Sequence, residues 1–209
     1  MRWLSALPLL VGVGGAAAQS PGAVRLDVRP GSTLSIDGSS NFRNWSCKAA
    51  TFEAHIDVDT TFAARDARQP LTEIVRQVSV KVAVRDFHCG NSAMENNLYK
   101  ALKADDPSTQ SNIVGVFSAV HGAAGQGPTF ETEGSITVAG VEKSVRVHIA
   151  VERLADGTIK AQGGVPLLMT DFSVKPPTGL FGLIRSRNEI VVKFDLVIAA
   201  HAGPAIRSR

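Results

Sequence analysis

The amino-acid sequence predicts a single all-β domain that carries one short α-helix. Runs of alternating apolar and polar residues recur along the chain, and this period of two is typical of strands that bury one face. Turn signals such as Pro30-Gly31 and Asp156-Gly157 separate the runs, as in a meander of sequential antiparallel strands. A helical period occurs in one stretch, at about residues 92–104. We therefore expect strands and tight turns around that one helix.

The first eighteen residues have the pattern of a secretory signal peptide. Arg2 precedes an apolar run, and the small residues Ala16-Ala17-Ala18 stand before Gln19. A positive start, a short apolar region and a small-residue cleavage site define such a signal, and the apolar run is too short to span a bilayer. We expect residues 1–18 to be removed and residues 19–209 to form one domain, which is periplasmic or secreted.

Four strands are expected before the helix, at residues 24–28, 34–36, 52–58 and 78–84. The third has the clearest pattern, since Phe52 and Ile56 share one face and His55 lies on the other. Residues 39–50 show no such pattern and are expected to be irregular.

The helix is predicted from its ends as well as from its period. Ser92 and Glu95 have the spacing of a capping box, which satisfies free N–H groups where a helix begins. Met94, Leu98 and Leu102 then recur on one face, and Pro107 prevents continuation because the residue before a proline avoids helical conformation. A single helix in such a chain is expected to cap the sheet structure.

Further strands are expected at residues 113–120, 129–138, 145–151, 159–162, 165–174 and 190–198. Eight to ten sequential strands favour an antiparallel sheet that curls, and closure into a barrel would remove its edges. A β-sandwich with jelly-roll connections is the alternative, and periodicity does not decide between them. The difference matters because a barrel of about eight strands can enclose one small ligand, whereas a sandwich fills itself with side chains.

Charge and cysteine content limit the functions to consider. The formal net charge is +3, and the basic residues are interspersed with acidic ones, so nucleic-acid binding is not indicated. Cys47 and Cys89 are the two cysteines. They cannot form a four-ligand zinc site by themselves. In an exported chain a structural disulfide is expected, and two buried thiols or a redox-active pair are the alternatives.

No enzyme or metal constellation is apparent. The histidines are scattered without metal-ligand spacing, at positions His55, His88, His121, His148 and His201. Asp57 and Asp59 would lie on one face at a strand end, where a solvated pair is the simpler interpretation than paired catalytic carboxylates. We therefore expect a protein without catalytic residues, resident metal or cofactor.

Four stretches together resemble a known family: STLSIDGSSNFRNWSC (32–47), the helix-bearing CGNSAMENNLYKALKADDPSTQSNIVGVF (89–117), the hairpin ETEGSITVAGVEKSVRVHIAV (131–151) and VPLLMTDFSVKPP (165–177). In their order and spacing they resemble the YceI-like family of exported bacterial proteins, in its branch with a cysteine pair. The resemblance covers about residues 24–199. It implies a lipocalin-like, extended antiparallel β-barrel that binds a polyprenyl chain or an isoprenoid quinone in an apolar interior.

Apolar residues on the inward faces are the candidate ligand contacts. They are Phe42, Trp45, Phe52, Ile56, Met94, Leu98, Leu102, Phe117, Leu167, Met169, Phe172 and Phe194. Core packing is the alternative role for each, since any barrel needs apolar residues to fold. Lys175, Arg185 and Arg187, around a Pro/Gly-rich loop, are the candidates for a polar headgroup. The expected partner is thus a hydrophobic lipid, and the alternative is a filled barrel that acts in protein interaction at the envelope, with a homodimer as an open question.

Overall fold

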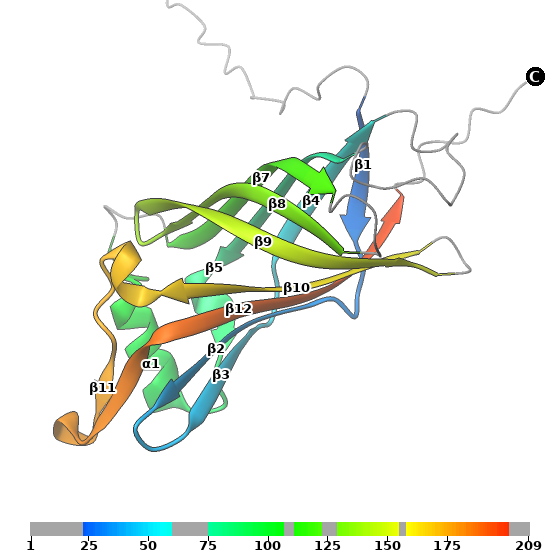
Figure 1. The fold of residues 1–209 in the computed structure, drawn as a ribbon. Helices are drawn as coiled ribbons and strands as arrows, with labels where there is room; N and C mark the ends of the chain where they lie inside the picture. The colour runs from blue at the N-terminus through cyan, green and yellow to red at the C-terminus, as the bar shows by residue number, and fades with distance from the viewer. Residues whose placement is uncertain (1–22, 60–74, 107–110, 123–128, 155–157, 201–209) are drawn as a thin grey trace, which may run out of the picture.

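The computed structural model describes residues 23–59, 75–106, 111–122, 129–154 and 158–200 (Figure 1). Eight antiparallel strands of this part close into a barrel, because the last strand pairs with β10 along one edge and with β1 along the other. Around the barrel they are β1 (Ala23–Val28), β4 (Glu53–Asp59), β5 (Val75–Ala83), β7 (Asn112–Gly122), β8 (Thr129–Val138), β9 (Val141–Arg153), β10 (Ile159–Leu168) and β12 (Ile184–Ala200). The expected barrel with one helix is confirmed, and the sandwich alternative is wrong.

The barrel is extended at one end by three further strands. After the turn at Pro30-Gly31, β2 (Thr33–Ser40) continues alongside β12. A hairpin then returns the chain as β3 (Asn44–Ala49), which pairs with β2, and the short β6 (Phe87–His88) pairs with β3. Figure 1 shows this extension at the bottom of the view, next to the helix α1 (Ser92–Ala101). The helix thus lies at the widened end of the barrel, as expected for a cap.

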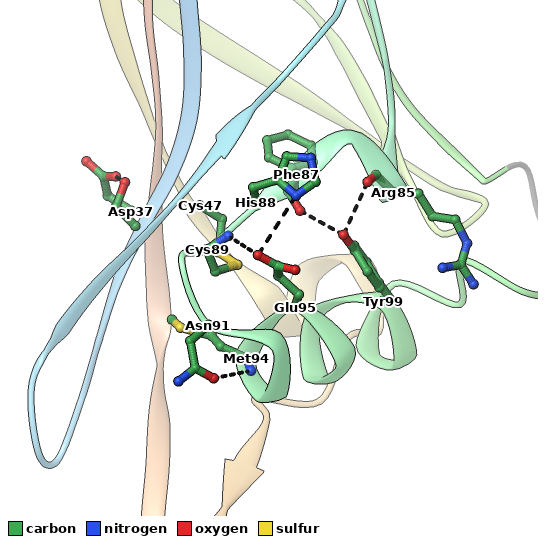
Figure 2. Close-up of a disulfide and its surroundings, with 11 residues drawn as sticks. Asp37, Cys47, Arg85, Phe87, His88, Cys89, Asn91, Met94, Glu95 and Tyr99 are labelled. Atoms are coloured by element: carbon green, nitrogen blue, oxygen red, sulfur yellow. Dashed lines mark hydrogen bonds and ion pairs between the residues drawn. A yellow bond between two sulfur atoms is a disulfide. The ribbon is translucent and has the colours of Figure 1, made fainter.

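The start of α1 differs in detail from the predicted capping box. Asn91, rather than Ser92, is the N-cap, and its side-chain oxygen accepts a hydrogen bond from the Met94 N–H at 3.2 Å. Glu95 reaches back further than a capping box requires, and its Oε1 accepts from the Cys89 N–H at 3.0 Å (Figure 2). The helix also ends three residues earlier than residue 104, because Lys103 has a positive φ of 52°.

A disulfide and a tyrosine fix the helix to the barrel. Cys47 of β3 is bonded to Cys89 in the segment just before α1 (Figure 2), so the expectation of a disulfide is confirmed and that of two thiols is wrong. On the next turns, the Tyr99 hydroxyl lies 2.9 Å from the Phe87 carbonyl oxygen and donates across to β6. Leu102, which caps the C-terminus of α1, is buried in the core.

Three predicted elements need correction. Residues 44–49 are not irregular but form β3. The strands expected at 159–162 and 165–174 are instead one strand, β10, followed by a 3₁₀ turn, η4 (Met169–Phe172). Pro166 is tolerated inside β10 because β9 pairs with β10 only as far as Gly164, so the proline faces an unpaired edge. Val84, predicted to end a strand, begins the 3₁₀ turn η3 (Val84–Asp86).

The chain between η4 and β12 forms a second projection beside the β2–β3 hairpin. It contains the two-residue strand β11 (Thr178–Gly179), which pairs with β12, and the 3₁₀ turn η5 (Leu180–Gly182). The predicted signal peptide and the turn at Asp156-Gly157 lie outside the described residues.

Candidate functional site

The barrel encloses a cavity of about 1040 Å³. Every one of the eight barrel strands contributes inward-facing residues, and β2, β3 and α1 line its wider end. Its volume is at the upper end of the range for small-molecule sites, which is about 300–1,000 Å³. Because the lining is almost entirely aliphatic and aromatic, water inside it would find few hydrogen-bond partners.

The apolar residues singled out from the sequence all line this cavity: Phe42, Trp45, Phe52, Ile56, Met94, Leu98, Leu102, Phe117, Leu167, Met169, Phe172 and Phe194. Strand alternation explains the agreement, since residues two apart point to the same side of the sheet. That they contact a ligand stays a prediction. Lining residues that the sequence reasoning missed include Phe130, Thr132 and Ile136 of β8, where the inward face has the same alternation and could have been read in the same way.

Three aromatic rings of the lining lie close to glycines of neighbouring strands. The pairs are Gly38 with Trp45, Gly134 with Phe117 and Gly163 with Phe194, and the two members of each pair are partners in the strand register. A Cβ on the glycine would come within 2.2, 2.5 and 2.4 Å of the respective ring. The missing side chains therefore make room for the rings along the wall. This arrangement keeps bulky aromatic residues in the lining while leaving the lumen open.

Gly134→Ala is accordingly expected to destabilise the protein by about 2–3 kcal/mol, as overpacking in a dense wall typically does. The added methyl group would meet the Val116 carbonyl oxygen at 2.2 Å as well as the Phe117 ring, so a side-chain rotation alone cannot relieve it. Chemical denaturation measures the loss. Gly164→Ala is the matched control, because its Cβ would lie at an ordinary 3.4 Å from Val191. Equal stability of the two variants would contradict the packing described here.

The cavity opens to solvent at the widened end of the barrel. Most lining residues are buried or half-buried, and those that are exposed come from three adjacent places. They are Phe42 and Arg43 in the β2–β3 turn, Asn91 and Ala93 at the start of α1, and Thr178, Leu180 and Phe181 in the β11–η5 segment. We call the opening between these three segments the mouth. The opposite end is closed by a buried cluster that includes Leu26, Val58 and Ile198.

Basic residues at the mouth differ from the predicted headgroup contacts. Lys175, Arg185 and Arg187 are exposed and do not line the cavity. Arg185 instead supports its own loop, with Nε donating to the Gly182 carbonyl oxygen at 3.0 Å. Arg43, which the sequence analysis did not single out, lines the mouth. It was missed because its position depends on the β2–β3 hairpin, which the sequence did not predict.

One polar atom in the cavity wall is buried without a partner. The Trp45 Nε1 has no hydrogen-bond partner among the described residues. A buried donor left in this way destabilises the folded state by about 1–3 kcal/mol. The Nε1 atom is buried away from the lumen as well as from solvent, so a molecule in the cavity does not contact it.

Asp57, Asp59 and His148, which were considered from the sequence, lie in ion pairs on the outer surface of the barrel. No cluster of three His, Cys, Asp or Glu side chains suited to a metal occurs in this part of the chain. Asp57 pairs with Arg25 at 3.2 Å and Asp59 with Arg76, on the outside of the barrel. Among the histidines, the exposed His148 lies 3.5 Å from Glu131, also in a surface pair.

Asp37 forms an ion pair with Lys193 on the outer wall of the barrel. Burial raises the pKa of Asp37, but hydrogen bonds from Lys193 and Ser46 outweigh this effect and hold the pKa below its usual value. The Lys193 Nζ lies 2.8 Å from Asp37 Oδ2 and ties β12 to β2. The shift reflects a structural ion pair rather than a reactive group.

Comparisons with known proteins identify the fold. No protein-family model and no curated protein sequence matches the chain, whereas several solved structures do. BcnA of Burkholderia cenocepacia is 19% identical over 83% of this chain and 100% of its own, with a TM-score of 0.65. A polyisoprenoid-binding domain of Saccharophagus degradans, implicated in plant cell wall breakdown, is 14% identical over 86% and 99%, with a TM-score of 0.59. The Campylobacter jejuni YceI protein is 16% identical over 92% and 93%, with a TM-score of 0.53.

The structural neighbours are YceI-like proteins, and this chain has their fold together with the expected cysteine pair. None of the helices in the described part is both long and apolar enough to cross a bilayer.

Proposed function

We propose that this protein is a YceI-like binding protein or carrier that holds an apolar, isoprenoid-type lipid inside its barrel and has no chemistry of its own. The cavity carries the proposal: it has a volume of about 1040 Å³, an apolar lining and one open end. A filled barrel, the alternative considered from the sequence, would have side chains in that space. The lining also lacks the polar cluster that a hydrolase would need among the described residues.

The free energy available from such a lining is sufficient for tight binding without specific polar contacts. Each methylene group moved from water into the cavity contributes about 0.8 kcal/mol. A polyprenyl chain or the tail of an isoprenoid quinone consists almost wholly of such apolar groups, which match the apolar lining of the cavity. The name of the Saccharophagus degradans neighbour supports the same class of ligand.

A polar headgroup would lie at the mouth, because the inner end is closed and apolar. The Arg43 guanidinium suits a phosphate or a carbonyl oxygen there. We propose Arg43, rather than Lys175, Arg185 and Arg187, as the headgroup contact.

Export to the periplasm is part of the proposal. The disulfide Cys47–Cys89 supports it, since such bonds persist in oxidising compartments. The signal-peptide pattern of residues 1–18 is the second support. There the protein would shield a lipid from water between two membranes or two enzymes.

Mass spectrometry of an organic extract tests the proposal. The protein is purified from its own periplasm without detergent, and the expected result is a polyprenyl or quinone species in near-equal amount to the protein. An extract without lipid, both as purified and after incubation with isoprenoid-containing vesicles, would overturn it.

A further inference from the structure

Four large apolar side chains are exposed around the mouth of the cavity. They are Phe42 in the β2–β3 turn and Leu180, Phe181 and Leu183 in and after η5, and we call them the tip patch. Phe181 is 109% exposed and Phe42 is 75% exposed, so neither packs on the barrel. Contiguous exposed apolar groups of this kind mark interaction sites. Figure 1 shows the two projections that carry them at the lower end of the barrel, beside α1.

The two projections form one surface, because hydrogen bonds join them. The Asn41 amide Nδ2 donates to the Leu183 carbonyl oxygen at 2.9 Å. The Arg185 backbone N–H donates to Asn41 Oδ1 at 2.8 Å, and the Asn41 backbone N–H donates to the Arg185 carbonyl oxygen at 3.1 Å. The β2–β3 turn and the β11–β12 segment are therefore held together as a rigid unit at the mouth.

The backbone holds the tip patch outward at a cost in stability. Leu180 and Phe181 have φ values of 46° and 55°, in the left-handed region that bulky residues rarely adopt. Two such residues in succession direct the Phe181 ring into solvent rather than into the apolar cavity beside it. The strained backbone keeps the Phe181 ring exposed although an apolar cavity lies beside it. Such strain indicates that the exposed ring has a function.

The charge around the patch is basic. The two segments that carry the patch, residues 172–188 and 38–46, contain no aspartate or glutamate, and they carry Arg43, Lys175, Arg185 and Arg187. Exposed apolar side chains with cations nearby in the same segments match the two layers of an anionic membrane surface, with phosphates outside and acyl chains beneath. A protein partner with an apolar pocket would not by itself account for the surrounding excess of positive charge.

We infer that the tip patch docks the protein on an anionic phospholipid membrane, with its apolar side chains in the acyl region and the arginines at the phosphates. The mouth would then face the bilayer, and a lipid could pass between membrane and cavity without crossing water. The purpose of the docking rests on the proposed function. The exposed apolar side chains and the basic charge at the mouth are observed independently of that function.

Vesicle flotation with the mature protein tests the docking. Vesicles of phosphatidylethanolamine and phosphatidylglycerol are expected to carry the protein upward, and vesicles of phosphatidylcholine to carry much less. Phe181→Ser/Leu183→Ser is expected to weaken binding at least about tenfold, the factor that burial of a single large apolar side chain can supply. Arg43→Gln/Arg187→Gln should weaken it as well and reduce its sensitivity to salt.

Matched controls separate the patch from general surface effects. Leu168→Ser removes another exposed leucine, on β10, and Arg146→Gln removes an exposed arginine on β9 that pairs with Glu133. Both are expected to float like the wild type.

Three outcomes would overturn the docking. They are flotation of Phe181→Ser/Leu183→Ser equal to that of the wild type, binding to neither kind of vesicle, and a wild-type dimer that this variant dissociates. Since flotation is scored separately from the lipid extract, a lipid-bearing protein that does not float contradicts the docking alone. A floating protein with an empty extract contradicts the carrier proposal alone.

Discussion

Leu98→Asp is expected to reduce the lipid retained by the purified protein by more than tenfold. Leu98 lies on the face of α1 that lines the cavity, and it packs against two of the three buried clusters of the barrel. A carboxylate there would have to lose its hydration among apolar groups, which is strongly unfavourable unless it is paired. A carboxylate at this position would therefore draw water into the widened end of the cavity. The amount of extracted lipid per protein is the quantity to measure.

Asn96→Asp is the matched control for that substitution. It adds the same negative charge to the same helix, but Asn96 is exposed and does not line the cavity, so lipid retention should stay at the wild-type level. Leu98→Asn introduces a polar but uncharged side chain. It replaces Leu98→Asp in the test if the aspartate variant does not fold. A Leu98→Asn protein with native far-ultraviolet circular dichroism and full lipid content would show that the ligand does not occupy this part of the cavity.

The sequence was sufficient to predict the barrel strands in which apolar and polar residues alternate cleanly. The expected range of β8, 129–138, is the observed one. In β12 the apolar residues from Ile190 to Ile198 recur at every second position and line the cavity, although the strand begins six residues earlier than expected, at Ile184. The β3 strand was missed even though Trp45 and Cys47 alternate with Ser46 and Lys48. The asparagines and serines before it are typical of turns, and they obscured a strand that is stabilised by pairing with β2 and by the disulfide.

The hollow interior could not be predicted in the same way. Whether inward side chains fill a barrel depends on which residues face each other across strands. The rings of Phe117 and Phe194 lie on Gly134 and Gly163, at sequence separations that only the strand register brings together. The mouth was unpredictable for a related reason. Leu180, Phe181 and Leu183 were not singled out from the sequence, where residues 175–182 were expected only as a Pro/Gly-rich loop, and the fold places their side chains at the mouth.

Removal of the disulfide by Cys47→Ser/Cys89→Ser is expected to lower the free energy of unfolding by about 3–4 kcal/mol. The bond joins residues that are 42 apart in the sequence, and on the chain-entropy model a loop of that length in the unfolded state accounts for this value. In a domain of this size the midpoint of thermal unfolding should fall by about 10 °C. Differential scanning calorimetry of the double variant, compared with the wild type before and after reduction, measures the effect.

The same variant should also exchange its lipid faster, because the disulfide is the covalent link between the barrel wall at β3 and the start of α1. Without it, the first turn of the helix is held by hydrogen bonds, such as the one from the Cys89 N–H to Glu95 Oε1, and these open more readily. Asn91 and Ala93 in this turn border the mouth, so loosening the turn would widen the path of the ligand. Transfer of a fluorescent polyprenyl analogue from protein to vesicles measures the rate at a temperature where both proteins are folded. A rate equal to that of the wild type, together with the expected loss of stability, would show that the helix start is not part of the path of the lipid.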